Sequence, residues 1–442
     1  MFCCILFIKS LKAVSTNISI IIPAFNSERF IKECVTNILN KINKKIELII
    51  INDNSNDNTK KICNRFVRKN NSIKLINLKK NCGVSVARNI GIRESKGKYL
   101  IFLDSDDLLV KDTLNKINKL IDKSDNKDII FFPSYDPINK IIDNNSLIKK
   151  FSNKIFINNI KNFSEFRLTC WNFVYKKNFL KERNIQFSNI RIFEEQTFLT
   201  KAIIEAKTFQ IFKTPLYQKR IIEVNSLSAK VGYDVMISCI KNLYALIKFY
   251  QKKRGAFNKI EKLFLDSRFT FLMEEIYKNI ILLKKKQINE ITKIISKKYN
   301  FKKNKIYTST DLKELFKDQK ALNKTLLRKN NIEKNKIFKI LNKISNEEII
   351  VYCAGSYSKI ILKLIPIYNI KIKFVCDSNL GFQNQKIYKH KIKSKKYLVK
   401  NLKKFSDNNI LISNFSIKTS INIKNDLVRS GFNKNKIHCL GY

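Results

Sequence analysis

Histidine is scarce in this chain of 442 residues, which has two, His390 and His438, both near the C-terminus. Triads and metal sites built on histidine are therefore excluded from the first three hundred residues. The ten cysteines are scattered and form no C-x-x-C pair, so the sequence indicates neither a zinc site nor a disulfide framework. Such cysteine use is typical of a reducing cytosol. Carboxylates are left to carry any chemistry in the first part of the chain.

Long apolar runs and acidic residues are also in short supply. The apolar start, 1–8, is far shorter than the ~20 residues of a membrane helix, and we interpret 1–16 as an N-terminal extension. Asp and Glu number 36 against 87 Lys and Arg, a net charge of +51. This excess attracts the phosphates of nucleic acids, nucleotides or anionic lipids without selecting among them. Because Lys, Asn and Ile are enriched together, as in an AT-rich genome, we give the charge little weight.

Strands and helices alternate in the first part of the chain. The β-branched run at 18–22 ends at Pro23, as a buried parallel strand would. Further strands are expected at 47–51, 73–78 and 99–103, with helices over 59–69 and 85–94 between them. This order predicts a wound α/β sheet. We expect Ser27 to cap the first helix.

The rest of the chain divides into two further parts. From Tyr233 the apolar residues follow helical spacing between Lys-rich faces, and no motif is present. A second strand and helix alternation begins at Glu348. We therefore expect four regions: the extension 1–16, a nucleotide-binding α/β domain over 17–232, a Lys-rich helical region over 233–346, and a Rossmann-like α/β domain over 347–442.

Acidic side chains follow the strand at 99–103. Ligands of open α/β sheets bind at the carboxyl ends of strands, where Asp104 and Asp106 could hold a divalent cation through hard oxygen ligands. The alternative is that these acids cap a helix over 108–120 and favour its dipole.

Three other residues stand at the ends of the expected strands or helices. Asp53 could read a nucleobase by hydrogen bonds, or could belong to a capped turn. Phe25 could offer a ring at the rim of the site, or fill the core. Arg88 lies in the first turns of a helix and could meet a diphosphate, or could be a solvated helix residue.

Taken in order, these segments resemble a family 2 glycosyltransferase with the nucleotide-sugar-binding GT-A fold. The segment 20–26 resembles the opening strand of the family, 52–59 its acidic turn, and 81–91 its loop beside the diphosphate. The family usually has two successive acids in the turn, and the first is Asn52 here. The resemblance implies a substrate-binding role for Pro23, Phe25, Asp53, Arg88 and Asp104, and a metal-binding role for Asp106.

The resemblance continues in a looser form to about residue 230. Trp171 opens a segment that resembles the border between sugar and acceptor, 216–217 resembles the closing strand, and 225–228 resembles the closing loop. The family normally has a Glu-Asp pair before a Phe, and this chain has Glu194 and Glu195. The resemblance implies that Glu195 is the catalytic base and that Trp171 and Glu194 bind substrate. The alternative is that both acids are solvated in the first turn of a helix over 194–204.

The function that this resemblance implies is inverting transfer of a sugar from a nucleotide diphosphate donor, typically a UDP-sugar, with Mn²⁺ or Mg²⁺ as cofactor. The acceptor would be a glycan or lipid-linked molecule of cell-surface polysaccharide synthesis. We expect a cytoplasmic protein held peripherally on the inner, anionic face of the membrane by its Lys-rich helices. The alternatives are a catalytically inactive nucleotide-sugar-binding module and a basic nucleic-acid-binding protein. Because the sequence lacks a nucleic-acid-binding module, no nucleic-acid partner is expected.

The C-terminal region carries part of a dinucleotide-binding fingerprint. Gly355 keeps one glycine of the turn, Ser358 stands where a third glycine would be, and Asp377 lies near the distance expected for a ribose-binding acid. The region resembles the Rossmann-like domains appended to some cell-surface sugar enzymes. We favour a scaffolding role over a bound dinucleotide.

Overall fold

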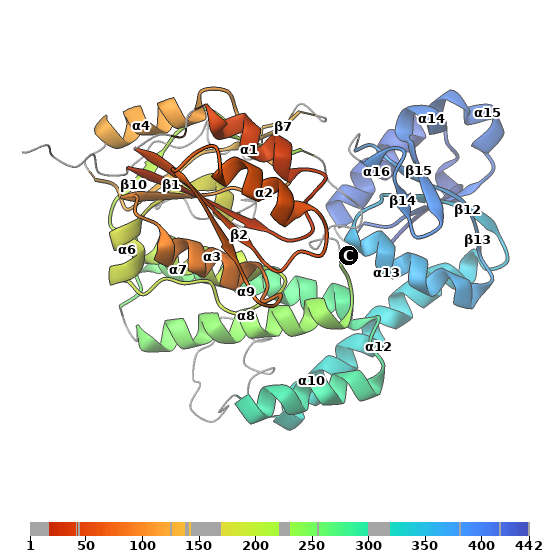
Figure 1. The fold of residues 1–442 in the computed structure, drawn as a ribbon. Helices are drawn as coiled ribbons and strands as arrows, with labels where there is room; N and C mark the ends of the chain where they lie inside the picture. The colour runs from red at the N-terminus through yellow and green to blue at the C-terminus, as the bar shows by residue number, and fades with distance from the viewer. Residues whose placement is uncertain are drawn as a thin grey trace, which may run out of the picture. The chain divides into compact units, whose positions relative to one another are not determined.

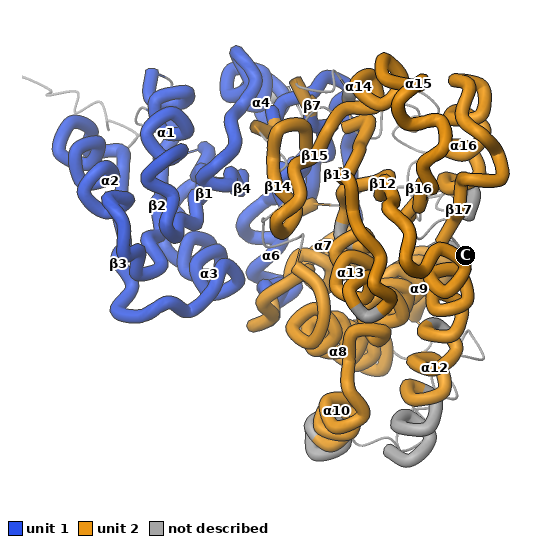
Figure 2. Tube along the Cα trace, turned by 90° about the vertical axis from the view of Figure 1, so that its right-hand side faces the viewer, with its two compact units in different colours: residues 1–134, 170–187, 205–218 blue, residues 135–169, 188–204, 219–442 orange. Residues whose placement is uncertain are grey.

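The computed structural model describes residues 17–40, 42, 45–123, 126–137, 141–142, 169–220, 230–253, 256–298, 319–379, 382–414 and 417–440. The expected extension 1–16 and closing loop 225–228 lie outside these residues. The chain divides into two compact units (Figure 2). Unit 1 holds residues 1–134, 170–187 and 205–218, and unit 2 holds 135–169, 188–204 and 219–442. The four regions expected from the sequence stay a prediction.

Unit 1 is built on a seven-stranded sheet with the order β10-β6-β9-β4-β1-β2-β3. The neighbours β4, β1, β2 and β3 are parallel, whereas β9 runs antiparallel to β4 and β6. The strands are β1 (Ile18–Ala24), β2 (Ile46–Asn52), β3 (Ile73–Asn77), β4 (Tyr99–Phe102), β6 (Ile129–Phe131), β9 (Phe173–Lys176) and β10 (Phe209–Ile211). All seven residues of β1 are buried, as its β-branched run predicts.

Helices cover this sheet, as Figure 1 shows. They are α1 (Ile31–Leu39), α2 (Thr59–Val67), α3 (Val84–Glu94), α4 (Thr113–Lys123) and α6 (Lys177–Glu182). The short strands β5 (Leu108–Leu109) and β11 (Tyr217–Gln218) pair antiparallel beside them. The α/β fold class is therefore confirmed, while Ser27 does not cap α1, whose N-cap is Phe30 without a side-chain hydrogen bond.

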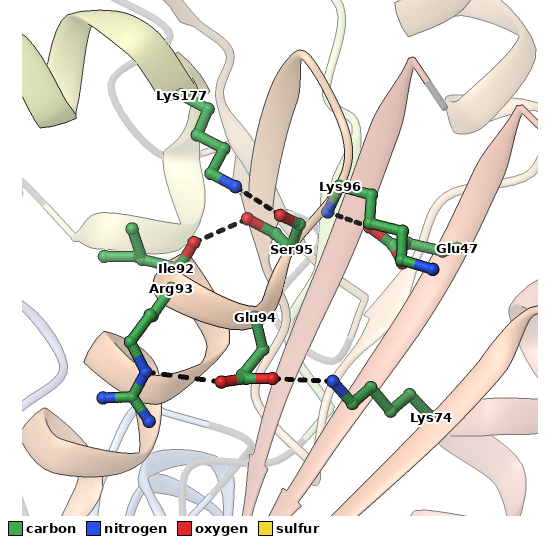
Figure 3. Close-up of polar contacts among 8 residues, drawn as sticks. All are labelled: Glu47, Lys74, Ile92, Arg93, Glu94, Ser95, Lys96 and Lys177. Atoms are coloured by element: carbon green, nitrogen blue, oxygen red, sulfur yellow. Dashed lines mark hydrogen bonds and ion pairs between the residues drawn. The ribbon is translucent and has the colours of Figure 1, made fainter. Parts of the chain in front are cut away.

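Polar side chains tie the turn between α3 and β4 to the amino ends of the strands (Figure 3). The Glu47 carboxylate accepts hydrogen bonds from the backbone N–H of Lys96 at 2.5 Å and from that of Gly97 at 3.2 Å. Lys177 donates to the backbone carbonyl of Ser95, and burial lowers the pKa of its ammonium group. The turn is thereby held close to β1 and β2, at the edge opposite to the predicted site.

This close approach makes Gly97 intolerant of a side chain. A Cβ at Gly97 would lie 2.5 Å from the backbone nitrogen of Ser19 and 2.7 Å from the carbonyl carbon of Ile18. We expect Gly97→Ala to lower the free energy of unfolding by about 1–3 kcal/mol, as overpacking does. The matched control is Gly355→Ala, because Gly355 has a φ of −74° and open space around its Cβ position. Urea unfolding compares the two variants, and equal losses would contradict the prediction.

Unit 2 contains a group of helices and a second sheet. Its helices before that sheet are α7 (Glu194–Glu205, whose last residue belongs to unit 1), α8 (Tyr233–Lys252), α9 (Lys259–Ile280), α10 (Lys285–Lys298) and α12 (Gln319–Lys343). The pair β7 (Ser134–Asp136) and β8 (Ile141–Ile142) is antiparallel. The helical pattern expected from Tyr233 onwards is confirmed at the first residue of α8. None of the described helices is long and apolar enough to cross a membrane.

The second sheet has the order β14-β15-β13-β12-β16-β17. All neighbours are parallel except β14 and β15. The strands are β12 (Glu348–Tyr352), β13 (Lys371–Asp377), β14 (Lys386–Ile387), β15 (His390–Ser394), β16 (Asn409–Ile412) and β17 (Ile437–Cys439). The helices are α13 (Ser356–Leu364), α14 (Lys395–Lys400), α15 (Leu402–Phe405) and α16 (Ile417–Arg429). This C-terminal sheet was expected from the sequence.

Candidate functional site

The polar segments that follow β1 and β2 are joined by hydrogen bonds. The backbone N–H of Asn26 donates to the Ser55 hydroxyl at 3.0 Å, and the backbone N–H of Asn56 donates back to the Asn26 side chain at 2.9 Å. Asn26 has a φ of 49°, a conformation that Asn tolerates better than most residues. Phe25 stands beside this junction with 46% of its surface exposed, so it is not part of the core. Pro23 is buried within β1.

Asp53 is buried and holds the loop before α3. One carboxylate oxygen accepts the backbone N–H of Cys82 at 2.7 Å, and the other accepts that of Gly83 at 2.8 Å. Gly83 has a φ of 89°, which glycine adopts without strain. The Asp53 carboxylate thus fixes the point where α3 begins. Recognition of a nucleobase by Asp53 stays a prediction.

Arg88 lies on α3 and pairs with Asp104 at the end of β4. The Nη2 to Oδ1 distance is 2.9 Å, and the side chains are 5% and 28% exposed. The guanidinium carbon also lies 5.3 Å from the centre of the Phe187 ring, within the range of a cation–π contact. Arg88 is therefore not a solvated helix residue. Its contact with a diphosphate stays a prediction.

A stacked aromatic pair lies next to the acidic segment, and one of its members is hydrogen-bonded to that segment. Tyr217 lies on β11 and stacks on Trp171, with ring centres 4.3 Å apart and 13° between the planes. The Tyr217 hydroxyl donates to the Asp107 carboxylate at 2.6 Å and accepts the backbone N–H of Asp104 at 3.3 Å. Burial, followed by the charge of Asp107, raises the pKa of Tyr217 well above its usual value. Tyr217 therefore stays protonated and holds both ends of the acidic segment.

The acids after β4 do not cap a helix over 108–120. Leu108–Leu109 forms strand β5, and α4 begins at Thr113. The Ser105 hydroxyl is 2.7 Å from the Ser27 hydroxyl, which ties the acidic segment to the segment after β1. Asp106 is exposed at this end of the sheet. The helix-cap alternative is therefore wrong for these residues.

The donors here suit a hard divalent cation that shares its coordination with a ligand. Among the residues that the structure describes, no three His, Cys, Asp or Glu side chains lie close enough to hold a metal ion by themselves. Mg²⁺ is commonly bound by one or two carboxylates together with substrate phosphates. Asp106, with Asp104 two residues away, offers oxygen ligands of this kind at the carboxyl end of β4. The residues fit such a shared site better than an all-protein cage.

Glu194 and Glu195 begin helix α7, and both belong to unit 2. Glu194 is buried and Glu195 is half-buried, so neither is a fully solvated helix acid. The start of α7 is fixed by Asn242 of α8, whose side-chain amide donates to the carbonyl of Phe193 at 3.0 Å and accepts the Thr197 hydroxyl at 2.6 Å. The other predicted site residues all belong to unit 1. The catalytic role of Glu195 and the binding role of Glu194 stay predictions.

Asp377, the acid of the C-terminal fingerprint, accepts hydrogen bonds from backbone N–H groups, as Asp53 does. Asp377 ends β13 and is buried, and its carboxylate accepts the backbone N–H of Ala354 at 2.6 Å and that of Asn379 at 2.7 Å. Burial raises the pKa of this carboxyl. The Ser358 hydroxyl is 2.6 Å from that of Ser413, which joins α13 to the end of β16. These contacts give Asp377 a structural part in the turn.

Two residues have contacts at the site that were not predicted from the sequence. Tyr217 supports the acidic segment, and Phe187 lies against Arg88. Tyr217 is 110 positions away from Asp107 in the sequence. An isolated aromatic residue in a short strand gives no local signal of such a contact, because the contact depends on the pairing of β11 with β5.

Comparison with known proteins supports the likeness in both sequence and fold. Residues 19–183 match the family model for glycosyl transferase family 2. The chain is 30% identical over 253 residues to the minor teichoic acid biosynthesis protein GgaB of Bacillus subtilis (strain 168), covering 55% of this chain and 28% of GgaB. It is 25% identical over 217 residues to the putative glycosyltransferase EpsH of the same strain, covering 46% and 60%. The chain thus spans less than two thirds of either relative.

A solved structure has a similar fold. The crystal structure of S. aureus TarS has a TM-score of 0.52 and 19% identity, covering 73% of this chain and 54% of that one. TarS 1–349 in complex with UDP-GlcNAc has a TM-score of 0.50 and 17% identity, covering 73% and 92%. At these identities the likeness concerns the fold. Together with the family match, it means that this chain contains a family 2 glycosyltransferase domain with the GT-A fold.

Proposed function

We propose that this protein transfers a sugar from a UDP-sugar to a glycan or lipid-linked acceptor in cell-surface polysaccharide synthesis, with inversion at the anomeric carbon. The observation that carries the proposal is the acidic segment at the end of β4. Arg88 pairs with Asp104, Tyr217 is hydrogen-bonded to Asp107, and Asp106 between them in the sequence is exposed. The UDP-GlcNAc complex of TarS supports the donor class. The name of GgaB supports an acceptor of the cell envelope.

Each group has a distinct task in this reaction. Phe25 offers its exposed ring to the base of the donor, and Pro23, Asp53 and Trp171 shape the binding surface around it. Asp106, with Asp104, would hold Mn²⁺ or Mg²⁺. When bound, the cation supplies stabilisation of the negative charge on the departing diphosphate.

The acceptor needs a base, because a sugar hydroxyl is a weak nucleophile. Glu195 takes the proton from the acceptor hydroxyl while the oxygen of that hydroxyl attacks the anomeric carbon. The bond between this carbon and the nucleoside diphosphate breaks on the opposite face. Glu194 contacts the substrate beside it. One displacement inverts the anomeric centre, and no covalent intermediate on the protein is needed. A specific observation favours a second function, an inactive nucleotide-sugar-binding module: Glu195 stands where the family has Asp, one methylene shorter.

The site is tested by titration calorimetry of UDP with Mn²⁺ and with a chelator. We expect Asp106→Asn to remove the Mn²⁺-dependent part of UDP binding, because Asp106 offers an exposed carboxylate at the end of β4. The matched control is Asp112→Asn, which removes the same charge from an exposed position outside the acidic segment. Mn²⁺ dependence that is unchanged in Asp106→Asn, or equally lost in the control, would refute the assignment.

A further inference from the structure

One part of unit 2 is basic without any acid of its own. Residues 382–406 contain nine lysines and no aspartate or glutamate, whereas the whole chain has 36 acids. They form β14, β15, α14 and α15 (Figure 1). A bias of the whole chain towards Lys does not explain this, because the Lys-rich helices α8, α9 and α10 keep acids such as Asp234, Glu275 and Glu290.

The strand register places the lysines of β14 and β15 on the face of the sheet that α14 and α15 cover. Ile387 and Ile392 belong to the core cluster on one face, together with Val375. Their alternate neighbours therefore point to the other face, where Leu398 of α14 and Phe405 of α15 pack. We call the lysines of this side the basic face: Lys386, Lys391 and Lys393 of the strands, and Lys396, Lys400, Lys403 and Lys404 of the helices.

Like charges stand next to one another on the basic face. Lys386 is directly opposite Lys391 in the antiparallel pair, an arrangement that is unfavourable between equal charges. Lys396 and Lys400 repeat this at a helical spacing of four. The neighbouring Lys395 has an ion pair with Asp426, but within the described part of the chain no ion pair joins an acid to the basic face. An external anionic surface would relieve this repulsion.

Protection of a sheet edge explains too few of these residues. β14 is the edge strand, and lysines on edge strands prevent pairing with other chains. That accounts for Lys386. It does not account for Lys391 and Lys393, whose strand is paired on both sides, or for the lysines of α14 and α15.

We propose that the basic face docks the protein onto an anionic lipid bilayer. All its charges are lysines, whose ammonium groups act as compact point charges, and residues 382–406 contain no arginine for bidentate recognition of a nucleic acid. Tyr397, 37% exposed, lies among them with the Lys393 ammonium 4.9 Å from the centre of its ring, and an exposed tyrosine suits the boundary between lipid and water. The inference extends the proposed function, because docking brings the enzyme to a lipid-linked acceptor, but lipid binding is measurable without transfer.

Flotation of the full-length protein with vesicles tests this. The variant Lys386→Gln/Lys391→Gln/Lys393→Gln should bind vesicles of phosphatidylglycerol and phosphatidylcholine about 100-fold more weakly, at about five-fold per lysine. The matched control is Lys284→Gln/Lys285→Gln/Lys286→Gln, which removes the same charge from exposed positions at the start of α10. We expect the control to bind as the unmodified protein does, and high salt to release both.

The possible outcomes separate the proposal from its rivals. Loss of binding in the α10 variant instead would move the docking surface to the Lys-rich helices, and equal small losses in both would mean attraction by net charge alone. Either result overturns the proposal, as does equal binding to pure phosphatidylcholine. Thermal unfolding checks that the triple variant is folded, and its stability should not fall, because the substitutions remove like-charge repulsion. UDP titration of the same variants tests the donor site separately.

Discussion

Glu195→Gln is expected to lower kcat for sugar transfer by about 10²–10⁴-fold, because general-base assistance is worth that much. UDP-sugar binding should be nearly unchanged, since the base acts on the acceptor rather than on the donor. The substitution keeps the size of the side chain and the first turn of α7. Release of UDP, followed over a range of UDP-sugar concentrations at saturating acceptor, separates kcat from the KM for the donor.

The matched control is Glu194→Gln, which removes the same charge one position earlier. Glu194 is buried and Glu195 is half-buried. We expect Glu194→Gln to raise KM more than it lowers kcat, in line with a binding role. If Glu194→Gln were the inactive variant and Glu195→Gln retained activity, the assignment of the base would be off by one residue. An unmodified protein that binds UDP-sugar without any transfer would identify the inactive module.

The strands of unit 1 could be predicted from the sequence because their residues carry a local signal. The β-branched run that became β1 is apolar at nearly every position, as a strand buried on both faces requires. The expected strand at 99–103 became β4 within one residue. Position at a strand end is equally local, so the acids of 104–107 and the exposed ring of Phe25 were placed correctly.

Features that depend on partners far along the chain were not predictable. Residues 108–112 carry a helical pattern but do not form a helix, because Leu109 pairs with Tyr217 and the Thr113 hydroxyl donates to the carbonyl of Leu216 at 2.8 Å. Ser27, which was expected to cap a helix, is hydrogen-bonded to the Ser105 hydroxyl instead. In each case a tertiary contact replaced the local preference.

The predicted roles of Asp53 and Arg88 illustrate a second limit. A motif names the residue type at a position but not the group that it meets within the protein. Asp53 holds two backbone N–H groups, and Arg88 holds Asp104. Both contacts shape the predicted site from within, which a list of ligand-binding positions does not reveal.

The Arg88–Asp104 pair should be asymmetric in its contribution to stability. Asp104→Asn removes the negative charge that faces the buried guanidinium of Arg88, which is 5% exposed, and we expect a loss of about 3 kcal/mol in the free energy of unfolding. Arg88→Met leaves a carboxylate that is 28% exposed and that water can solvate. Its loss should be clearly smaller, at about 1 kcal/mol.

The double variant Arg88→Met/Asp104→Asn distinguishes a charge effect from a packing effect. If the buried charge causes the loss, removing Arg88 in the Asp104→Asn background should restore part of the stability, with a coupling of about 1–3 kcal/mol. Losses that simply add would mean that the two side chains contribute independently through packing. Urea unfolding followed by circular dichroism measures all three variants. Because Asp104 is two residues from Asp106, binding of UDP and Mn²⁺ by Arg88→Met reports how far the ion pair positions the acidic segment. A weaker Mn²⁺ dependence with an intact fold makes Arg88 a positioning residue. Unchanged binding means that Arg88 contributes to stability alone.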